Sequence, residues 1–141
     1  MNYNGNTREK TKGLSEMMKK HINQITYRES GMGKGQTFTW KKATRTLRLE
    51  DEEGNASEDV LLLSEHEQME LEHLLLHVNL MHWQPVYTTE WLILDGTNWE
   101  IRWSGPNGEG TSRGSNAFPD KWELLRDWLY GQFVKNGEDN K

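Results

Sequence analysis

The sequence predicts an α+β fold in which two main helices pack on an antiparallel β-sheet built of meander and hairpin strands. Residues 25–63 and 91–114 contain short segments in which apolar residues alternate with polar ones or cluster between turns, as in strands. Each region is followed by a segment with the apolar spacing of an amphipathic helix. The 141 residues match the usual length of one domain.

The first region predicts four strands separated by turns. The apolar residues expected on one face are Ile25 and Tyr27, Phe38 and Trp40, Leu47 and Leu49, and the short run Val60 to Leu63. The glycine-rich residues 31–35 and the acidic residues 51–57 supply turn chemistry between them. These strands predict an antiparallel meander with one apolar face.

A helix is expected directly after this meander. Ser64 and Glu67 have the spacing of a capping box, in which each side chain satisfies a free backbone N–H group of the first turn. The helix is expected to run from Glu65 to about Leu80, because Pro85 bars its continuation. The face toward the core is expected to carry Leu71, Leu74, Leu75 and Val78.

The second region repeats the order of strands followed by a helix. We expect a buried strand at Trp91 to Leu94 and further strands at Trp99 to Trp103 and Thr111 to Gly114. Pro119 and Asp120 are expected to open the last helix, with Glu123 at capping-box spacing from Asp120. One stripe of that helix carries Trp122, Leu125, Leu129 and Phe133.

The ends of the chain are expected to lie outside the folded domain. Residues 1–13 are rich in Asn, Thr, Lys and Gly and predict a disordered tail. The single α+β domain is expected to span residues 14–134, and residues 135–141 are expected to fray. Because only 33% of residues are apolar but seven are Trp, we expect a thin core built on aromatic side chains.

Composition excludes several classes of protein. The absence of Cys removes disulfides, thiolate metal sites and a Cys nucleophile. No segment approaches the about 20 apolar residues of a membrane span, and the first 20 residues lack the apolar run of a signal peptide. We therefore expect a cytoplasmic protein that does not bind membranes. No set of catalytic residues stands out, so we expect neither enzymatic activity nor a cofactor.

The charge of the chain is unevenly distributed. Residues 1–48 carry 11 Lys or Arg and 3 Asp or Glu, whereas residues 49–141 carry 6 and 19. An acidic surface can attract a basic protein and occupy its nucleic-acid-binding groove. We therefore expect a protein-binding module, such as an immunity protein or a phage-encoded inhibitor of a defence system, acting as a monomer or homodimer. The residues expected to meet the partner are Asp51, Glu52, Glu53, Glu58, Asp59, Glu67 and Glu70.

Two alternative functions remain open. The first strands carry basic residues near aromatic ones, a combination that binds single-stranded nucleic acids; the basic residues are Arg28, Lys34, Lys41, Lys42, Arg45 and Arg48. The net charge of −5 opposes this alternative. The second is metal binding by His66, His73 and His77 on one stripe of the helix after Ser64, with Glu70 beside them. We expect this stripe to be a solvated face that holds no metal.

The second half resembles a group of small bacterial proteins without an established activity. The resemblance is carried by Trp83, by Asp95-Gly96-Thr97-Asn98-Trp99, and by Gly114-Ser115-Asn116-Ala117-Phe118-Pro119 followed by Trp122. It implies no catalytic residue, and a role as an inhibitor or immunity protein follows from it by analogy alone. The chemistry of these residues is that of turns, so we expect them to build a corner of the fold.

Overall fold

The first four strands form the antiparallel meander that the alternating pattern predicts. The computed structural model describes residues 21–31, 34–51, 58–89 and 96–139. The four strands pair in chain order and are β1 (Gln24–Gly31), β2 (Lys34–Lys41), β3 (Thr46–Asp51) and β4 (Glu58–Leu62). Each lies where the sequence predicts it, because alternation places Ile25, Tyr27, Phe38, Trp40 and Leu47 on the same buried face.

The second half of the chain extends the same sheet on the other side of β1. Its elements are α2 (Glu65–His77), the 3-10 helix η1 (Leu80–His82), β5 (Val86–Thr88), β6 (Asn98–Gly105), β7 (Gly108–Ser115) and α3 (Trp122–Asp139). β6 pairs antiparallel with β1, which gives a seven-stranded sheet in the order β4-β3-β2-β1-β6-β7-β5. Among the described strands, β5 alone runs parallel to its neighbour, β7.

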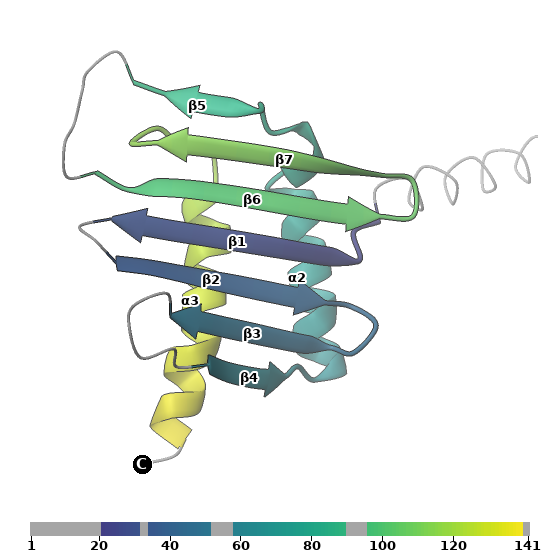
Figure 1. Cartoon of the computed structure of the whole chain (residues 1–141). Helices are drawn as coiled ribbons and strands as arrows, with labels where there is room; N and C mark the ends of the chain where they lie inside the picture. The colour runs from purple at the N-terminus through teal and green to yellow at the C-terminus, as the bar shows by residue number, and fades with distance from the viewer. Residues whose placement is uncertain (1–20, 32–33, 52–57, 90–95, 140–141) are drawn as a thin grey trace, which may run out of the picture.

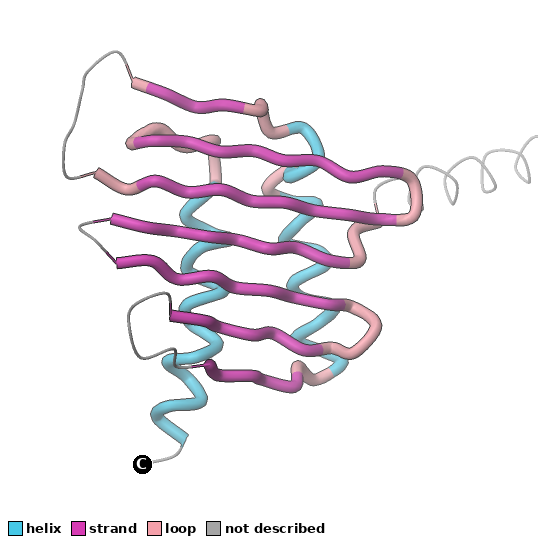
Figure 2. The backbone as a smooth tube through the Cα atoms, viewed as in Figure 1, coloured by secondary structure: helices cyan, strands magenta, loops and turns pink. Residues whose placement is uncertain are grey.

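Both long helices pack on one face of the sheet and cross its strands, while the opposite face carries no described helix (Figures 1 and 2). The core lies between these layers. Trp99 and Ile101 of β6 join the buried residues of the meander there, with Leu71 and Leu75 of α2 and Leu125 and Leu129 of α3. The predicted fold class, a single α+β domain with two helices on a mostly antiparallel sheet, is confirmed.

The helix α2 begins at the predicted residue and ends sooner than expected. The Glu67 N–H group donates to Oγ of Ser64 at 3.0 Å, and Oε1 of Glu67 accepts from the Ser64 N–H group at 2.9 Å. This is the predicted capping box. Asn79 has a φ of 56°, a left-handed conformation that a right-handed helix cannot continue through. The predicted end near Leu80 is therefore wrong, and α2 ends at His77.

The helix α3 begins later and ends later than expected. Lys121 has a φ of 66°, so the right-handed helix starts only at Trp122. Asp120 belongs to the turn before the helix, in which the Trp122 N–H group donates to the Pro119 carbonyl at 3.2 Å. The prediction that Pro119 and Asp120 open the helix is wrong for this reason. At its other end α3 continues to Asp139, well into the segment that we expected to fray.

The residues that carry the resemblance build a corner between β6 and α3. Asn116 has a φ of 53°, and its Oδ1 accepts from the Thr97 N–H group at 2.8 Å. A Cβ atom on Gly96 would lie 1.7 Å from that oxygen, so a residue with a side chain does not fit there. Nε1 of Trp99 donates to the Ala117 carbonyl at 2.9 Å. The expected structural role of this motif is confirmed in its described residues.

Three expectations fall outside the described residues: the tail 1–13, most of the acidic turn at residues 52–57, and the strand Trp91 to Leu94. Conversely, β5 was not predicted from the sequence. It has three residues, too few to show a period, and it follows directly after Pro85. Its strand character depends on pairing with β7, which lies more than 20 residues further along the chain.

Candidate functional site

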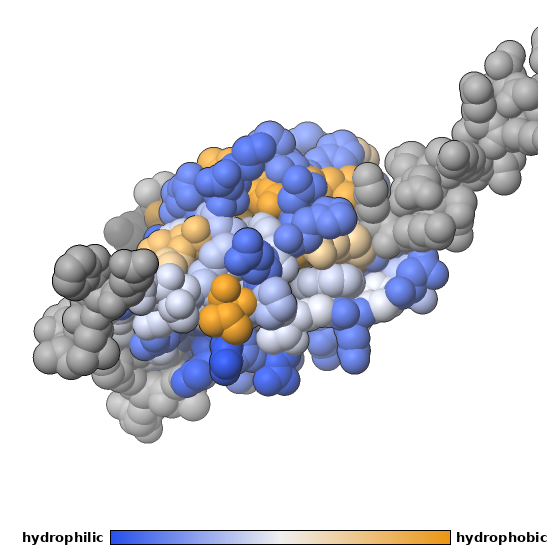
Figure 3. Space-filling view, turned by 90° about the horizontal axis from the view of Figure 1, so that it is seen from above, coloured by the Kyte–Doolittle hydropathy of each residue, from blue (hydrophilic) through white to orange (hydrophobic). Residues whose placement is uncertain are grey.

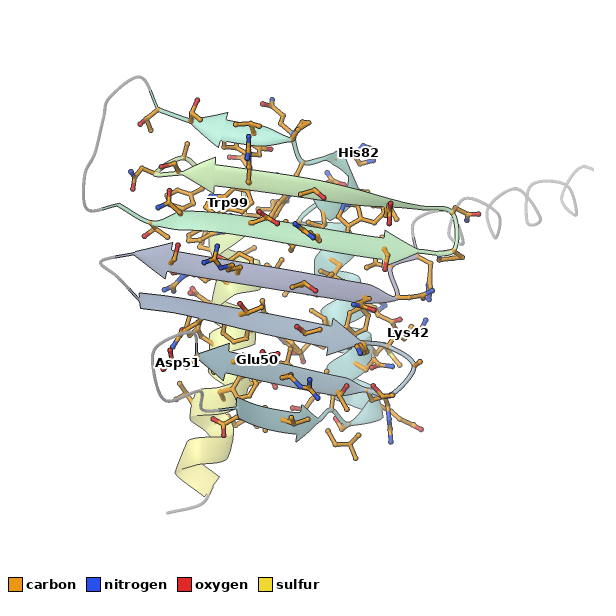
Figure 4. All side chains as sticks on the ribbon, viewed as in Figure 1. Lys42, Glu50, Asp51, His82 and Trp99 are labelled. Atoms are coloured by element: carbon orange, nitrogen blue, oxygen red, sulfur yellow. The ribbon has the colours of Figure 1, made fainter. Side chains whose placement is uncertain are left out.

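The acidic residues expected to meet a partner are divided between two layers of the fold. Asp51 ends β3, and Glu58 and Asp59 begin β4, the edge strand beside it. Asp51 and Glu50 lie at the same end of β3 (Figure 4). Glu67 and Glu70 lie on α2 in the helical layer, while Glu52 and Glu53 lie outside the described residues. The structure thus brings three of the seven together at the β4 edge.

The two α2 carboxylates have partners within the protein. The hydrogen bond from the Ser64 N–H group holds the pKa of Glu67 below its usual value, and Nζ of Lys135 lies 3.8 Å from Oε2 of Glu67. Oε1 of Glu70 accepts from Nε1 of Trp128 at 2.6 Å. Lys135 and Trp128 belong to α3, so these carboxylates help to join the two helices.

The edge strand β4 combines outward-facing backbone groups with exposed apolar side chains. Val60 is 50% exposed and Leu62 is 68% exposed, on the face without helices. The Leu63 N–H group donates to the Arg45 carbonyl at 2.8 Å, just beyond the ladder with β3. Because residues of an antiparallel strand point their backbone groups alternately to each side, those of Leu61 face β3, and those of Val60 and Leu62 face outward. No described strand pairs with that outer edge.

The opposite edge of the sheet, formed by β5, is less suited to pairing with another strand. β5 has three residues, and Pro85 directly before it has no N–H group to donate. Hydrophilic residues cover much of this end of the molecule, and hydrophobic ones appear there in separate patches (Figure 3). Of the two sheet edges, β4 is therefore the better template for another strand.

The basic residues of the first sheet are separated from the aromatic ones. Register places Arg28, Lys41 and Arg48 on the face without helices, whereas Tyr27, Phe38 and Trp40 are buried against the helices on the other. Nζ of Lys42 pairs with Oε1 of Glu72 at 2.8 Å and contacts Nε2 of His21. Bases could not stack on these aromatic rings, and the expectation that the rings belong to the core is confirmed.

The histidine stripe of α2 faces outward as expected. His66, His73 and His77 are all exposed, and Nε2 of His66 lies 3.8 Å from Oε2 of Glu70. Within the part of the chain that the structure describes, no three His, Asp or Glu side chains are grouped so that they could hold a metal ion.

One motif was missed in the sequence. Gly110-Thr111-Ser112-Arg113-Gly114 matches the G-x-S-x-G spacing of the nucleophile elbow in α/β-hydrolases. That elbow is a sharp turn between a strand and a helix, whereas Ser112 lies in the middle of β7. Ser112 is 2% exposed, and its Oγ donates to the Gln84 carbonyl at 2.5 Å. Its hydroxyl holds the chain before β5 against β7.

A group of polar side chains lies between β1 and α3 on the helical side. Nε of Arg126 donates to both oxygens of Glu29, at 3.0 and 3.2 Å, and the Tyr27 hydroxyl donates to Oε2 of Glu29 at 2.9 Å. Burial, reinforced by the Glu29 charge, raises the pKa of Tyr27. Burial opposes the charge of Arg126, but Glu29 outweighs it and the pKa of Arg126 is raised. Tyr27 stays neutral and Arg126 charged, so the group anchors α3 to the sheet.

Comparison with protein-family models finds none that matches this chain, and comparison with characterised proteins finds no significant match. None of the helices in the described ranges combines the length and apolar character needed to cross a lipid bilayer. The function is therefore inferred from the geometry of the sheet and its surfaces.

Proposed function

We propose that this protein is a protein-binding module that takes an extended segment of its partner as an additional strand on β4. The observation that carries the proposal is the β4 edge, where outward-facing backbone groups stand beside exposed Val60 and Leu62. Strand addition uses main-chain hydrogen bonds for affinity and alternate side chains for specificity.

The exposed side chains define what the added segment must present. Val60 and Leu62 lie on one face, two residues apart, so an extended segment beside them would place alternate residues against this apolar pair. An apolar residue at those alternate positions would remove exposed surface from water, at about 25 cal/mol for each Å² buried. The segment should therefore be apolar at alternate positions.

The charges near β4 define the flanks of the segment. Glu50, Asp51 and Asp59 lie at the end of the sheet edge where β4 begins. Their negative charge favours Lys or Arg near the end of the partner segment that lies beside Asp59, and it accelerates association with a basic protein. A nucleic-acid-binding protein with a basic groove is a partner of this kind, and covering its groove would inhibit it.

The test first selects peptides that bind the protein and then measures their binding to a variant in which the β4 edge is blocked. A displayed library of random nine-residue peptides is selected against the wild-type protein, and binding of the enriched peptides is measured by fluorescence anisotropy. We expect the enriched sequences to carry alternating apolar residues beside Lys or Arg. Val60→Pro removes an outward-facing N–H group and keeps the bonds of Leu61 to β3, so it should weaken binding at least about tenfold.

Val60→Ile is the matched control, because it keeps the outward N–H group, the apolar side chain and the strand preference. Its affinity should stay within about threefold of the wild type, a difference of roughly 0.7 kcal/mol. A library without enriched peptides, or peptides that bind Val60→Pro as tightly as the wild type, would overturn the proposal. Thermal unfolding of both variants establishes that they are folded.

A further inference from the structure

A cavity of about 310 Å³ lies on the helix-free face of the sheet, at the end where β6 begins near Trp99 (Figure 4). Two cross-strand rows of side chains line it. The outer row consists of short polar side chains from four neighbouring strands, Ser30, Asn98, Ser115 and Thr88. The inner row consists of Arg28, Glu100, Arg113 and Val86. The register of the sheet, rather than any local motif, brings these residues together.

The inner row places one carboxylate between two guanidinium groups. Glu100 lies directly between Arg28 on β1 and Arg113 on β7. Nε of Arg102 donates to Oε1 of Glu100 at 2.8 Å from the side of Glu100 away from the polar row. The Glu100 carboxylate thus has Arg102 as an ion-pair partner. Within the described ranges, no carboxylate lies within ion-pair distance of Arg113.

We propose that this cavity binds a small phosphate-bearing molecule. Arg28 and Arg113 flank the cavity from two strands, and guanidinium groups match the geometry of phosphate oxygens. The outer row adds hydroxyl and amide groups that donate hydrogen bonds to the same anion or to polar groups attached to it. The volume is at the lower end of the range for small-molecule sites, which fits a phosphate with a small organic group.

A nucleic-acid strand fits this surface less well than a small phosphate compound. The face between the cavity and β4 bears Glu50 as well as Arg48, and no aromatic residue occupies the helix-free positions of β1, β2 or β3. Bases would thus find no ring on which to stack along those strands.

Isothermal titration calorimetry at low salt tests the proposal with inorganic phosphate, pyrophosphate and glycerol 3-phosphate, and with succinate as a carboxylate comparison. Arg28→Gln and Arg113→Gln should each weaken phosphate-ester binding at least about tenfold, the loss expected for a charged hydrogen bond. Arg48→Gln is the matched control, because Arg48 lies on the same face two strands from Arg28. It should change the affinity less than about threefold.

A phosphoserine-containing peptide distinguishes a protein source of the phosphate from a free metabolite. Glycerol 3-phosphate binding more tightly than the phosphopeptide assigns the site to small molecules, and the reverse order contradicts that assignment. The absence of binding by every phosphate probe at millimolar concentration, or an equal loss in Arg48→Gln and Arg113→Gln, overturns the site. Val60→Pro should leave phosphate binding unchanged, so this result is independent of the β4 edge.

Discussion

Asn116 and Thr97 are joined by two hydrogen bonds, one from the Thr97 N–H group to Oδ1 of Asn116 at 2.8 Å and one from the Asn116 N–H group to the Thr97 carbonyl at 3.0 Å. We expect Asn116→Ala to lower the free energy of unfolding by about 1–3 kcal/mol, because it removes the carboxamide and strains the left-handed backbone. Urea unfolding followed by tryptophan fluorescence measures this change. Asn116→Gly also lacks the side-chain hydrogen bond, but it relieves the backbone strain. It should therefore lower the free energy of unfolding less than Asn116→Ala does.

Substitution by alanine should have opposite effects on stability at Gly114 and at Gly131. A Cβ atom on Gly114 would lie 2.4 Å from Nε1 of Trp99 and 2.5 Å from the Ala117 carbonyl oxygen, whereas one on Gly131 would meet nothing within 4 Å. Gly114→Ala should destabilise the protein by about 1–3 kcal/mol through overpacking. Gly131→Ala, inside α3, should stabilise it by about 0.5–1 kcal/mol. Thermal unfolding of the two variants compares them, and a stabilised Gly114→Ala would contradict the close packing at Trp99.

The ion pair between Arg126 and Glu29 should contribute to stability, because it is largely screened from water. The Glu29 side chain is 12% exposed, and Arg126→Met would leave this carboxylate without its cation. We expect a loss of about 1.5–3 kcal/mol in the free energy of unfolding. Arg102→Met is the control, because the Arg102 side chain is 70% exposed, and it should change stability by less than about 1 kcal/mol. Similar losses in both variants would contradict the anchoring role of Arg126.

The capping box should make the free energy of unfolding depend on pH in the acidic range. Folding lowers the pKa of Glu67 below its ordinary value of 4.5, so the unfolded state binds the proton more readily. The stabilisation is therefore complete above pH 4.5 and is lost as the pH falls through the lower pKa of the folded state. Glu67→Gln should be less stable than the wild type at pH 7, and the difference should shrink below pH 4.5. Urea unfolding at a series of pH values measures it, and a constant difference down to pH 3 would count against the cap.

The elements that the sequence predicts correctly are those with a local cause. Ile25 and Tyr27 alternate with polar neighbours, so β1 is evident before its partners are known. Ser64 and Glu67 fix the start of α2 through bonds within one turn. The start of α3 was mispredicted because Lys121 adopts a left-handed conformation that its residue type does not indicate.

The candidate sites depend on contacts between distant segments, which explains why the sequence does not show them. The proposed phosphate site combines Arg28, Glu100 and Arg113 from three strands, and only the strand pairing shows that these three residues come together. The composition of the acidic segment is evident in the sequence, but only the sheet order shows that β4 is an edge. The residue types of a strand do not indicate whether its outward-facing backbone groups are paired.

The pairing of β1 with β6 affects how the protein is made. Ile25 lies opposite Trp103, so β1 cannot pair with β6 until residues 98–105 have left the ribosome. Contacts between segments this far apart in the chain form slowly, and an unpaired strand with apolar residues can associate with other chains meanwhile. The middle of the sheet is therefore completed only after β6 has been synthesised, and protection from aggregation matters most before that point.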